Sequence, residues 1–329
     1  GGFIYVGGNA IIAKISLSSF TIVNSITLTG KACQQQAVAI DTINGYIYFA
    51  TGSHTIEKIR ISDFTLVSTL NITYNAASLV IDISGGYLYA GISSISIKKI
   101  YKIELSTFTK VAECSIFNGV GAGVGIKEGN FLYFSTYPSP YKISKVDIAS
   151  FTEVATLTPG NAAYVINSDG IYLYASEYTG QVQKISINTF TIESTLNLET
   201  PSGLYIPSTS FICNQFLYIA VRYNATYVIV YQVNLNTFTK VTQFSYPGYD
   251  KFYSSVYDSI NKKGYFAEYE AEESKIVRFS IDCTASPYPP ADPIDDNPDT
   301  LPDPGGDPQE ITFRWETYKA IRSDESLLK

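Results

Sequence analysis

The chain has 329 residues and is rich in aromatic side chains, with 27 Tyr and 18 Phe, while only 16% of its residues are charged. Its net charge is −7, and residues 287–308, which hold six Asp and no Lys or Arg, supply −6 of it. The rest of the chain therefore lacks a basic surface able to neutralise phosphates, and nucleic acid is not an expected partner. No run approaches the roughly 18 apolar residues of a membrane helix, so no membrane span is expected.

The chain starts inside a strand-like run, Gly1-Gly-Phe3-Ile-Tyr5-Val, and contains no Met. This indicates a processed, exported protein that is extracellular or held at a cell surface. The alternative, that the sequence is partial, stays open. Asn71 and Asn224 begin Asn-x-Thr sequons and are the candidate N-glycosylation sites of such a glycoprotein.

One phrase, Lys-Ile-x-Leu-x-x-Phe-Thr with small variations, returns six times along the chain. Successive Phe residues of the phrase lie 44, 44, 43, 39 and 48 positions apart, at Phe20, Phe64, Phe108, Phe151, Phe190 and Phe238. A seventh copy begins at Arg278-Phe-Ser-Ile281 and lacks the Phe. A period of this length, made of short β segments, is typical of a β-propeller. Seven copies predict an all-β, seven-bladed β-propeller over residues 1–286.

Each repeat contains four strand patterns. A Tyr- or Phe-rich run such as Tyr46-Ile-Tyr48 comes before the Lys phrase, and a third run such as residues 66–70 follows the Phe-Thr turn. A fourth run is small and apolar and ends in a polar turn, as in Ala37-Val-Ala-Ile-Asp41. Asp, Asn and Gly at these turns tolerate a tight backbone.

In this spacing and in the Lys phrase, the chain resembles the large superfamily of YVTN- and NHL-type seven-bladed propellers, including repeats of secreted surface proteins of protists and bacteria. The resemblance covers residues 1 to about 284. It implies an architecture and no particular activity, with the small apolar run as the innermost strand of each blade and the run after Phe-Thr as the outermost. On that order the first blade starts at its second strand. The last blade lacks its outer strand, because prolines follow Cys283.

The C-terminal tail has two parts. Residues 287–308 hold eight of the 14 Pro, and we expect an extended, self-repelling linker of roughly 70 Å. In residues 309–329, a docking tail, apolar and polar residues alternate as in a half-buried strand over 311–318. A helix over 315–328 is the competing interpretation. The expected self-association residues, docking on an unpaired edge of the first or last blade, are Ile311, Phe313, Trp315 and Tyr318.

Little in the chain indicates catalysis, a metal or another cofactor. The single His54 excludes a His-based triad or a multi-His metal site. Asp41, Asp82 and Asp258 begin turns, so we interpret them as turn caps rather than as converging metal ligands. The repeated Lys stems are expected to cover apolar surface while their heads reach water, rather than to form an anion-binding ring; they belong to Lys14, Lys58, Lys102, Lys145 and Lys184.

The four cysteines, Cys33, Cys114, Cys213 and Cys283, allow three disulfide connectivities. Cys213 ends an inner strand of the sixth repeat, and Cys283 ends the third strand of the seventh. Both strands run in the direction that brings these ends to the same edge of two neighbouring blades. A Cys213–Cys283 disulfide is therefore the first choice.

These features favour a non-enzymatic, structural or adhesive propeller outside the cell. Its tail would dock on a neighbouring copy, in a heterologous contact that propagates into a chain or filament of the protein with itself. The alternative is a monomeric propeller that binds a glycan or a protein on one face, since Tyr rings stack on sugars. A lactonase- or lyase-type enzyme acting in the channel is the least favoured class.

Overall fold

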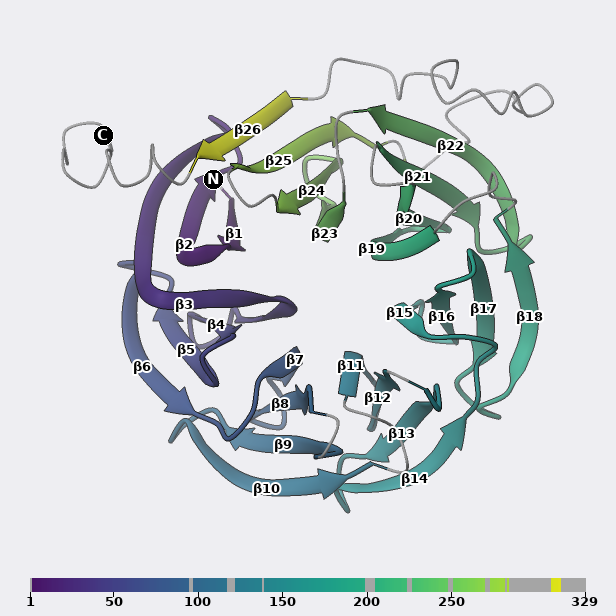
Figure 1. Ribbon diagram of the computed structural model, residues 1–329, viewed down its shortest axis with the longest axis horizontal. Coiled ribbons are helices and arrows are strands. Elements are labelled where there is room, and N and C mark those ends of the chain that lie inside the picture. Colours follow the sequence, from purple (N-terminus) through teal and green to yellow (C-terminus); the bar gives the residue numbers. More distant parts are fainter. Residues whose placement is uncertain are drawn as a thin grey trace. The chain divides into compact units, whose positions relative to one another are not determined.

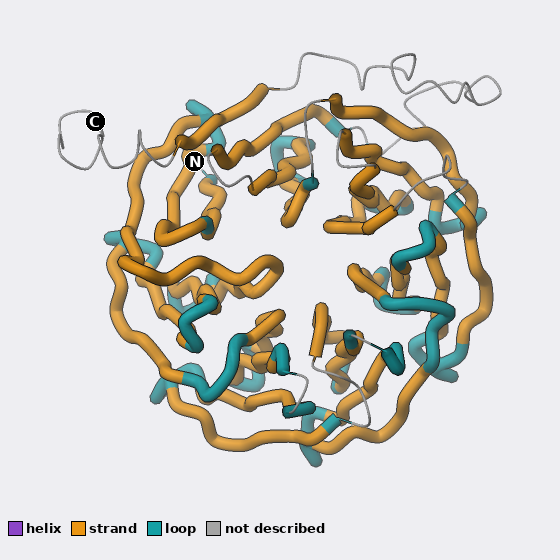
Figure 2. The backbone as a smooth tube through the Cα atoms, viewed as in Figure 1, coloured by secondary structure: helices purple, strands orange, loops and turns teal. Residues whose placement is uncertain are grey.

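The computed structural model describes residues 2–94, 97–116, 122–137, 139–198, 205–223, 227–247, 251–269, 273–281, 283 and 309–314. All regular structure in this part of the chain is β-strand, coloured orange in Figure 2. No helix in it is long and apolar enough to cross a membrane. The chain forms two compact units, one of residues 1–162 and one that starts at Ala163 and includes the last strand.

The first unit begins with a six-stranded antiparallel sheet. Its strands are β1 (Phe3–Gly7), β2 (Asn9–Ser16), β3 (Thr21–Asp41), β4 (Tyr46–Thr51), β5 (Thr55–Arg60) and β6 (Thr65–Asn71). The long β3 belongs to two meanders, because its first half pairs with β2 from Thr21 and its second half pairs with β4 up to Asp41. In Figure 1, β3 is the purple strand that runs from β2 to β4.

Two four-stranded sheets complete the first unit. One consists of β7 (Ala76–Asp82), β8 (Tyr87–Ile92), β9 (Lys99–Glu104) and β10 (Thr109–Ser115). The other consists of β11 (Ala122–Glu128), β12 (Phe131–Thr136), β13 (Ile143–Asp147) and β14 (Thr152–Leu157).

The second unit contains three four-stranded sheets. The first has β15 (Ala163–Ser168), β16 (Tyr172–Glu177), β17 (Gln181–Ser186) and β18 (Ile192–Asn197). The second has β19 (Tyr205–Cys213), β20 (Phe216–Tyr223), β21 (Tyr227–Asn234) and β22 (Thr239–Pro247). The third has β23 (Phe252–Asp258), β24 (Lys263–Tyr269), β25 (Glu273–Ser280) and β26 (Gln309–Arg314).

The burial of successive strands follows the order that the sequence predicts within a repeat. The Tyr-rich strands β4, β8, β12 and β16 are buried in all but their first residue. The strands after the Phe-Thr turn, β6 and β18, are almost wholly exposed. A sheet strand that is buried on both faces lies between neighbours, and an exposed one lies at an edge. The predicted all-β fold with four strands per repeat is thus present.

The Phe of the repeated phrase adopts a left-handed backbone conformation. Its φ lies between 50° and 54° in all six copies, Phe20, Phe64, Phe108, Phe151, Phe190 and Phe238. Such a φ is unusual for a bulky residue and costs roughly 1–2 kcal/mol. It closes the hairpin between the strand that carries the repeated Lys and the strand that follows the Phe-Thr turn. A bulge lies at the Lys position of the same hairpin, for example between Lys58 and Ile59.

Packing between sheets explains why Phe rather than Gly occupies this strained position. Phe108, in the turn after β9, is 6% exposed and its ring centre lies 5.6 Å from that of Tyr48 in the preceding sheet. In the second unit, Phe238 lies 6.1 Å from Tyr174 of the preceding sheet in the same way. The core of each unit therefore lies between neighbouring sheets, and the Phe108 and Phe238 rings fill part of that space.

Candidate functional site

The last sheet obtains its fourth strand from a distant part of the chain. Strands β23, β24 and β25 follow one another, whereas β26 starts at Gln309, with residues 281–308 between Ser280 and it. It pairs antiparallel with β25, with Arg278 opposite Gln309 and Glu273 opposite Arg314. In the sheet before it, the equivalent pair β21 and β22 is joined by a turn between Asn234 and Thr239. β26 therefore fills an edge that the contiguous repeat leaves open (Figure 1).

The edge that accepts β26 is part of a formed core. Ile276 and Val277 of β25 are 1% and 0% exposed. Val277 lies in one buried cluster with Phe252, Phe266 and Cys283. β25 thus packs into the core of its own sheet through Val277, as an acceptor strand requires.

A disulfide lies where the chain leaves this sheet. Cys213, the last residue of β19, is bonded to Cys283, and their Cα atoms are 5.8 Å apart. The Asn214 side chain also donates a hydrogen bond to the carbonyl of Cys283, at 3.3 Å. This is the pairing that the sequence favours. It anchors the start of the linker to the neighbouring sheet, while Cys33 and Cys114 are free thiols.

The predicted self-association residues are placed only in part. Ile311 and Phe313 belong to β26, opposite Ile276 and Ser274 of the same chain. Trp315 and Tyr318 lie outside the described residues, as do the linker 287–308 and the competing helix over 315–328. The strand expected over 311–318 is thus present as Gln309–Arg314, and here its partner is its own chain. Docking on a second copy stays a prediction.

One of the two glycosylation candidates can be located. Asn71 is exposed and ends β6. Asn224 lies outside the described residues.

The repeated Lys heads lie on aromatic rings; only Lys58 is buried, which differs from the expectation that the heads reach water, while the other four are half-buried. The Nζ atom lies 4.0–4.2 Å from the centre of the first aromatic ring of the preceding strand in five repeats, for Lys14, Lys58, Lys102, Lys145 and Lys184. Lys58 is 8% exposed and donates to the Leu105 carbonyl at 3.1 Å, and burial lowers its pKa. These cations stabilise the packing of aromatic rings.

The turn-initiating carboxylates cap turns, as the sequence predicts. Asp41 accepts hydrogen bonds from the backbone and side-chain nitrogens of Asn44, at 2.9 and 2.8 Å. Asp258 accepts equivalent bonds from Asn261, at 3.1 and 2.6 Å. Asp82 accepts from the Ser84 hydroxyl at 2.9 Å. His54 lies exposed in the turn between β4 and β5.

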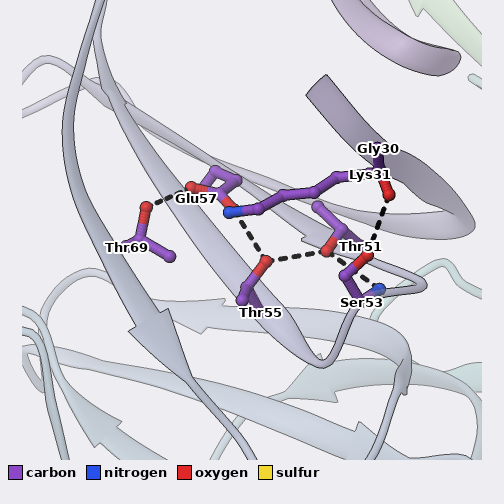
Figure 3. A network of polar contacts seen from close by, with 7 residues as sticks. All are labelled: Gly30, Lys31, Thr51, Ser53, Thr55, Glu57 and Thr69. Atoms are coloured by element: carbon purple, nitrogen blue, oxygen red, sulfur yellow. Dashed lines mark hydrogen bonds and ion pairs between the residues drawn. The ribbon is translucent and has the colours of Figure 1, made fainter. Parts of the chain in front are cut away.

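The sequence analysis did not identify a buried carboxylate in the first unit, that of Glu57. Glu57 of β5 is 0% exposed and pairs with Lys31 of β3, with Nζ and Oε1 2.7 Å apart. Thr55 and Thr69 donate their hydroxyls to the same carboxylate, and Thr51 bonds to Thr55 at 2.7 Å (Figure 3). The network joins the middle of β3 to β5 and β6.

Comparison of the repeats in the sequence distinguishes Glu57 from the residues at the same position in the other copies. Glu57 directly precedes the repeated Lys, where the other copies have Ala13, Tyr101, Ser144, Gln183, Tyr231 and Val277. The acid is thus peculiar to one sheet. Cys33 lies close to it, and burial together with the Glu57 charge raises the pKa of this thiol to about 12. The thiol is therefore protonated near neutral pH and is a poor nucleophile.

A stacked aromatic pair, with one exposed and one half-buried ring, lies in the loop between β12 and β13. Tyr137 is 54% exposed and stacks on Tyr141, with ring centres 6.5 Å apart and an angle of 19°. The loop is closed by Thr136 and Lys142, whose backbone and side-chain groups exchange hydrogen bonds. A stacked pair of this kind, with one ring exposed, offers a flat apolar surface with polar hydroxyls.

Comparison with known proteins shows the fold and no family. No family model and no curated protein matches the chain. Among solved structures, one of hydrazine synthase from Kuenenia stuttgartiensis is similar with a TM-score of 0.71 and 14% identity, over 86% of this chain and 94% of that one. A chain of a mitotic checkpoint complex is similar with a TM-score of 0.66 and 11% identity, over 81% of each chain. At these identities the likeness shows an all-β propeller fold alone.

Proposed function

We propose that this protein is an extracellular structural propeller that assembles with itself by strand exchange. In the proposed assembly, β26 of one copy pairs with β25 of the next copy, in the register that it adopts within one chain. The observation that carries the proposal is that β26 alone among the strands of the last sheet arrives through a long Pro- and Asp-rich segment.

The seven-bladed architecture of YVTN or NHL type is part of the proposal. The six-stranded sheet divides within β3, where pairing passes from β2 to β4. Counted as two blades, it joins five four-stranded sheets to make seven. The first of the two then has three strands and the last sheet has a fourth strand from the tail.

The contacts between β25 and β26 are the same whether the strand pairs within one chain or with a neighbouring copy. The equilibrium between these two states therefore depends on the linker. Arg278 and Gln309 lie opposite each other, and therefore residues 279–308 must form a closed loop when the strand pairs with its own chain. Pro-rich, like-charged segments are stiff and resist closure, which lowers the effective concentration of a chain's own strand. A neighbouring copy accepts the same strand without this cost, and such head-to-tail contacts propagate into a chain.

A disulfide trap tests the proposal directly. Lys275 and Thr312 face each other in the β25–β26 register, so Lys275→Cys with Thr312→Cys allows a bond across the pair. Oxidation during assembly is expected to give a ladder of covalent oligomers on a non-reducing gel. Lys275→Cys alone is the matched control and can link two chains at most. A single, internally linked monomer at all protein concentrations would overturn strand exchange between copies.

The alternative function is a monomeric module that binds a glycan or a protein, and the Tyr137–Tyr141 pair favours it. An aromatic pair that has one exposed ring and is held by a closed loop is suited to stacking on a sugar ring. If the trap gives only monomer, this function takes first place. It predicts that Tyr137→Ala lowers oligosaccharide affinity at least about tenfold, or 1.4 kcal/mol, by calorimetry. Val154→Ala, at an exposed site on β14, is the control.

A further inference from the structure

Strand β6 ends its sheet with an open edge. It is the last strand in the order of the six-stranded sheet, and among the described residues it pairs only with β5. Five of its seven residues are exposed, and the other two, Thr69 and Leu70, are half-buried. The adjacent Leu66 and Val67 are 42% and 41% exposed. An open edge with apolar side chains is a template on which a strand of another molecule can pair.

β6 lacks the charged residues that protect the equivalent edges. β10, β14, β18 and β22 also follow a Phe-Thr turn and also end their sheets. Each of them contains Lys or Glu, namely Lys110 and Glu113 in β10, Glu153 in β14, Glu193 in β18 and Lys240 in β22. β6 reads Thr-Leu-Val-Ser-Thr-Leu-Asn and contains no charged residue. Charged side chains on an edge strand oppose pairing with another chain, whereas uncharged strands of this length favour it.

The bulge of the repeat does not set β6 apart. It lies at the Lys position in the hairpins of β6, β10, β14, β18 and β22 alike. The first half of β3 is also uncharged, but β3 continues past Thr27 into a second pairing with β4. Among the strands that follow a Phe-Thr turn and end a sheet, β6 is therefore the uncharged one.

The last residue of β6 begins a sequon that is open to solvent. Asn71 lies opposite Thr55 and is the final residue of the β5–β6 pairing. Asn71 and Thr73 are exposed, while Ile72 between them is 7% exposed and donates its backbone N–H to the His54 carbonyl at 2.8 Å. The sequon is thus anchored at its centre and exposed at the two residues that define it as a glycosylation acceptor.

We infer that Asn71 carries an N-linked glycan that keeps the edge of β6 from pairing with a second copy of this chain. An N-glycan is bulky and hydrophilic, so at the end of β6 it obstructs an incoming strand where the other edges have a charged side chain. The partner that it excludes is a second copy, because every copy presents the same edge and two uncharged edges meet without repulsion. The inference rests on the proposed extracellular location but not on strand exchange by β26.

Two substitutions of Thr73 test the inference. Thr73→Ala removes the sequon, and Thr73→Ser keeps it and is the matched control. The full chain is secreted from a eukaryotic host, and peptide mass is expected to show a glycan on Asn71 in the wild-type and Thr73→Ser proteins. We expect Thr73→Ala to lower the dimer dissociation constant in sedimentation velocity at least about tenfold relative to Thr73→Ser. An unmodified Asn71 in the wild-type protein, or equal association of the two variants, would overturn the inference.

A charged residue on the edge should replace the glycan. Val67→Lys in the Thr73→Ala protein is expected to return association to the level of Thr73→Ser, because a Lys then opposes pairing as in β10 and β22. Since Val67 is exposed, a Lys there does not repair a folding defect, and rescue therefore separates edge pairing from misfolding without the glycan. Association that Val67→Lys leaves unchanged contradicts the inference. Pairing through β26 is common to all of these proteins, so a failure of strand exchange appears only in the disulfide trap.

Discussion

Single residues of the repeat combine strain with packing. The Phe of each phrase has a positive φ, which a Gly would adopt without strain. At Phe108 the ring fills the space between two sheets. Lys58 contacts rings of two sheets, since its ammonium lies 4.2 Å from the Tyr46 ring and 5.5 Å from the Phe108 ring. A single repeat thus contributes side chains that stabilise its neighbour.

Two substitutions of Phe108 distinguish the stability that its ring contributes from the strain of its positive φ. Phe108→Ala is expected to lower the free energy of unfolding by about 3–5 kcal/mol, because the buried ring is lost. Phe108→Gly loses the same ring but relieves the positive φ of 52°, so it should be no less stable than the Ala variant. Urea denaturation measures both. A loss below about 1 kcal/mol for both variants would show that the ring does not contribute to the core.

Buried tyrosines predict a loss of stability in alkali. Burial raises the pKa of Tyr133 to about 12, and it also raises the pKa of Tyr48, Tyr89 and Tyr174. Above pH 10 the unfolded chain loses phenol protons that the folded chain keeps, so the free energy of unfolding falls as pH rises. Below pH 10 this contribution is fully present. Burial lowers the pKa of Lys58 and of Lys145, which acts in the opposite direction, but these two Lys are outnumbered by the Tyr whose pKa is raised.

The measurement is the free energy of unfolding from pH 8 to pH 11. Tyr133→Phe is expected to make the decline above pH 10 shallower, by up to one proton in the slope. A free energy of unfolding that stays constant between pH 10 and 11 would contradict the prediction.

At the scale of elements, β3 and β26 are the two strands that depart from the plain repeat. β3 joins two meanders, and the Glu57–Lys31 pair connects its middle to β5. Gly30, with a φ of 73°, supplies the backbone conformation next to Lys31. β26 lacks the Phe turn and the bulge, since its pairing with β25 shows no shift of register.

We expect Glu→Gln substitution to lower the free energy of unfolding more at the buried Glu57–Lys31 pair than at an exposed Glu–Lys pair. Glu57→Gln is expected to lower the free energy of unfolding by about 1–3 kcal/mol, because the buried charge is lost beside Lys31 and two hydroxyl donors. Glu113→Gln is the matched control, since Glu113 pairs with Lys99 and Lys110 at the surface and should change stability little. Equal effects by urea denaturation would show that burial of Glu57 does not matter.

For the whole molecule, the disulfide is the covalent tie between distant residues. Cys213 and Cys283 are 70 residues apart, so the bond restricts a long loop of the unfolded chain. Cys213→Ser with Cys283→Ser is expected to lower the free energy of unfolding by about 4 kcal/mol. The same change also frees the start of the linker. Cys114→Ser, at a buried thiol without a bond, is the control for the loss of a sulfur atom.

The sequence by itself determined what is local in this protein. Strand patterns, the Phe-Thr turn, the Asx caps at Asp41 and Asp258 and the period between copies are all encoded within a few residues of one another, so a repeat of them predicts the same hairpins each time. The pairing of Cys213 with Cys283 was also accessible, because the repeat places both at strand ends of neighbouring sheets.

Tertiary structure decided what joins distant residues. The Lys58 head was expected in water and lies on the Tyr46 ring, because Phe108 and the Leu105 carbonyl of the next sheet cover it. Glu57 contacts Lys31 only after the second half of β3 has paired with β4, whose other neighbour is β5. Gln309–Arg314 pairs with β25 only after a long loop has closed or a second copy has come near. Such pairings depend on loop closure and on the burial that a neighbouring sheet imposes, and no short stretch of sequence contains either.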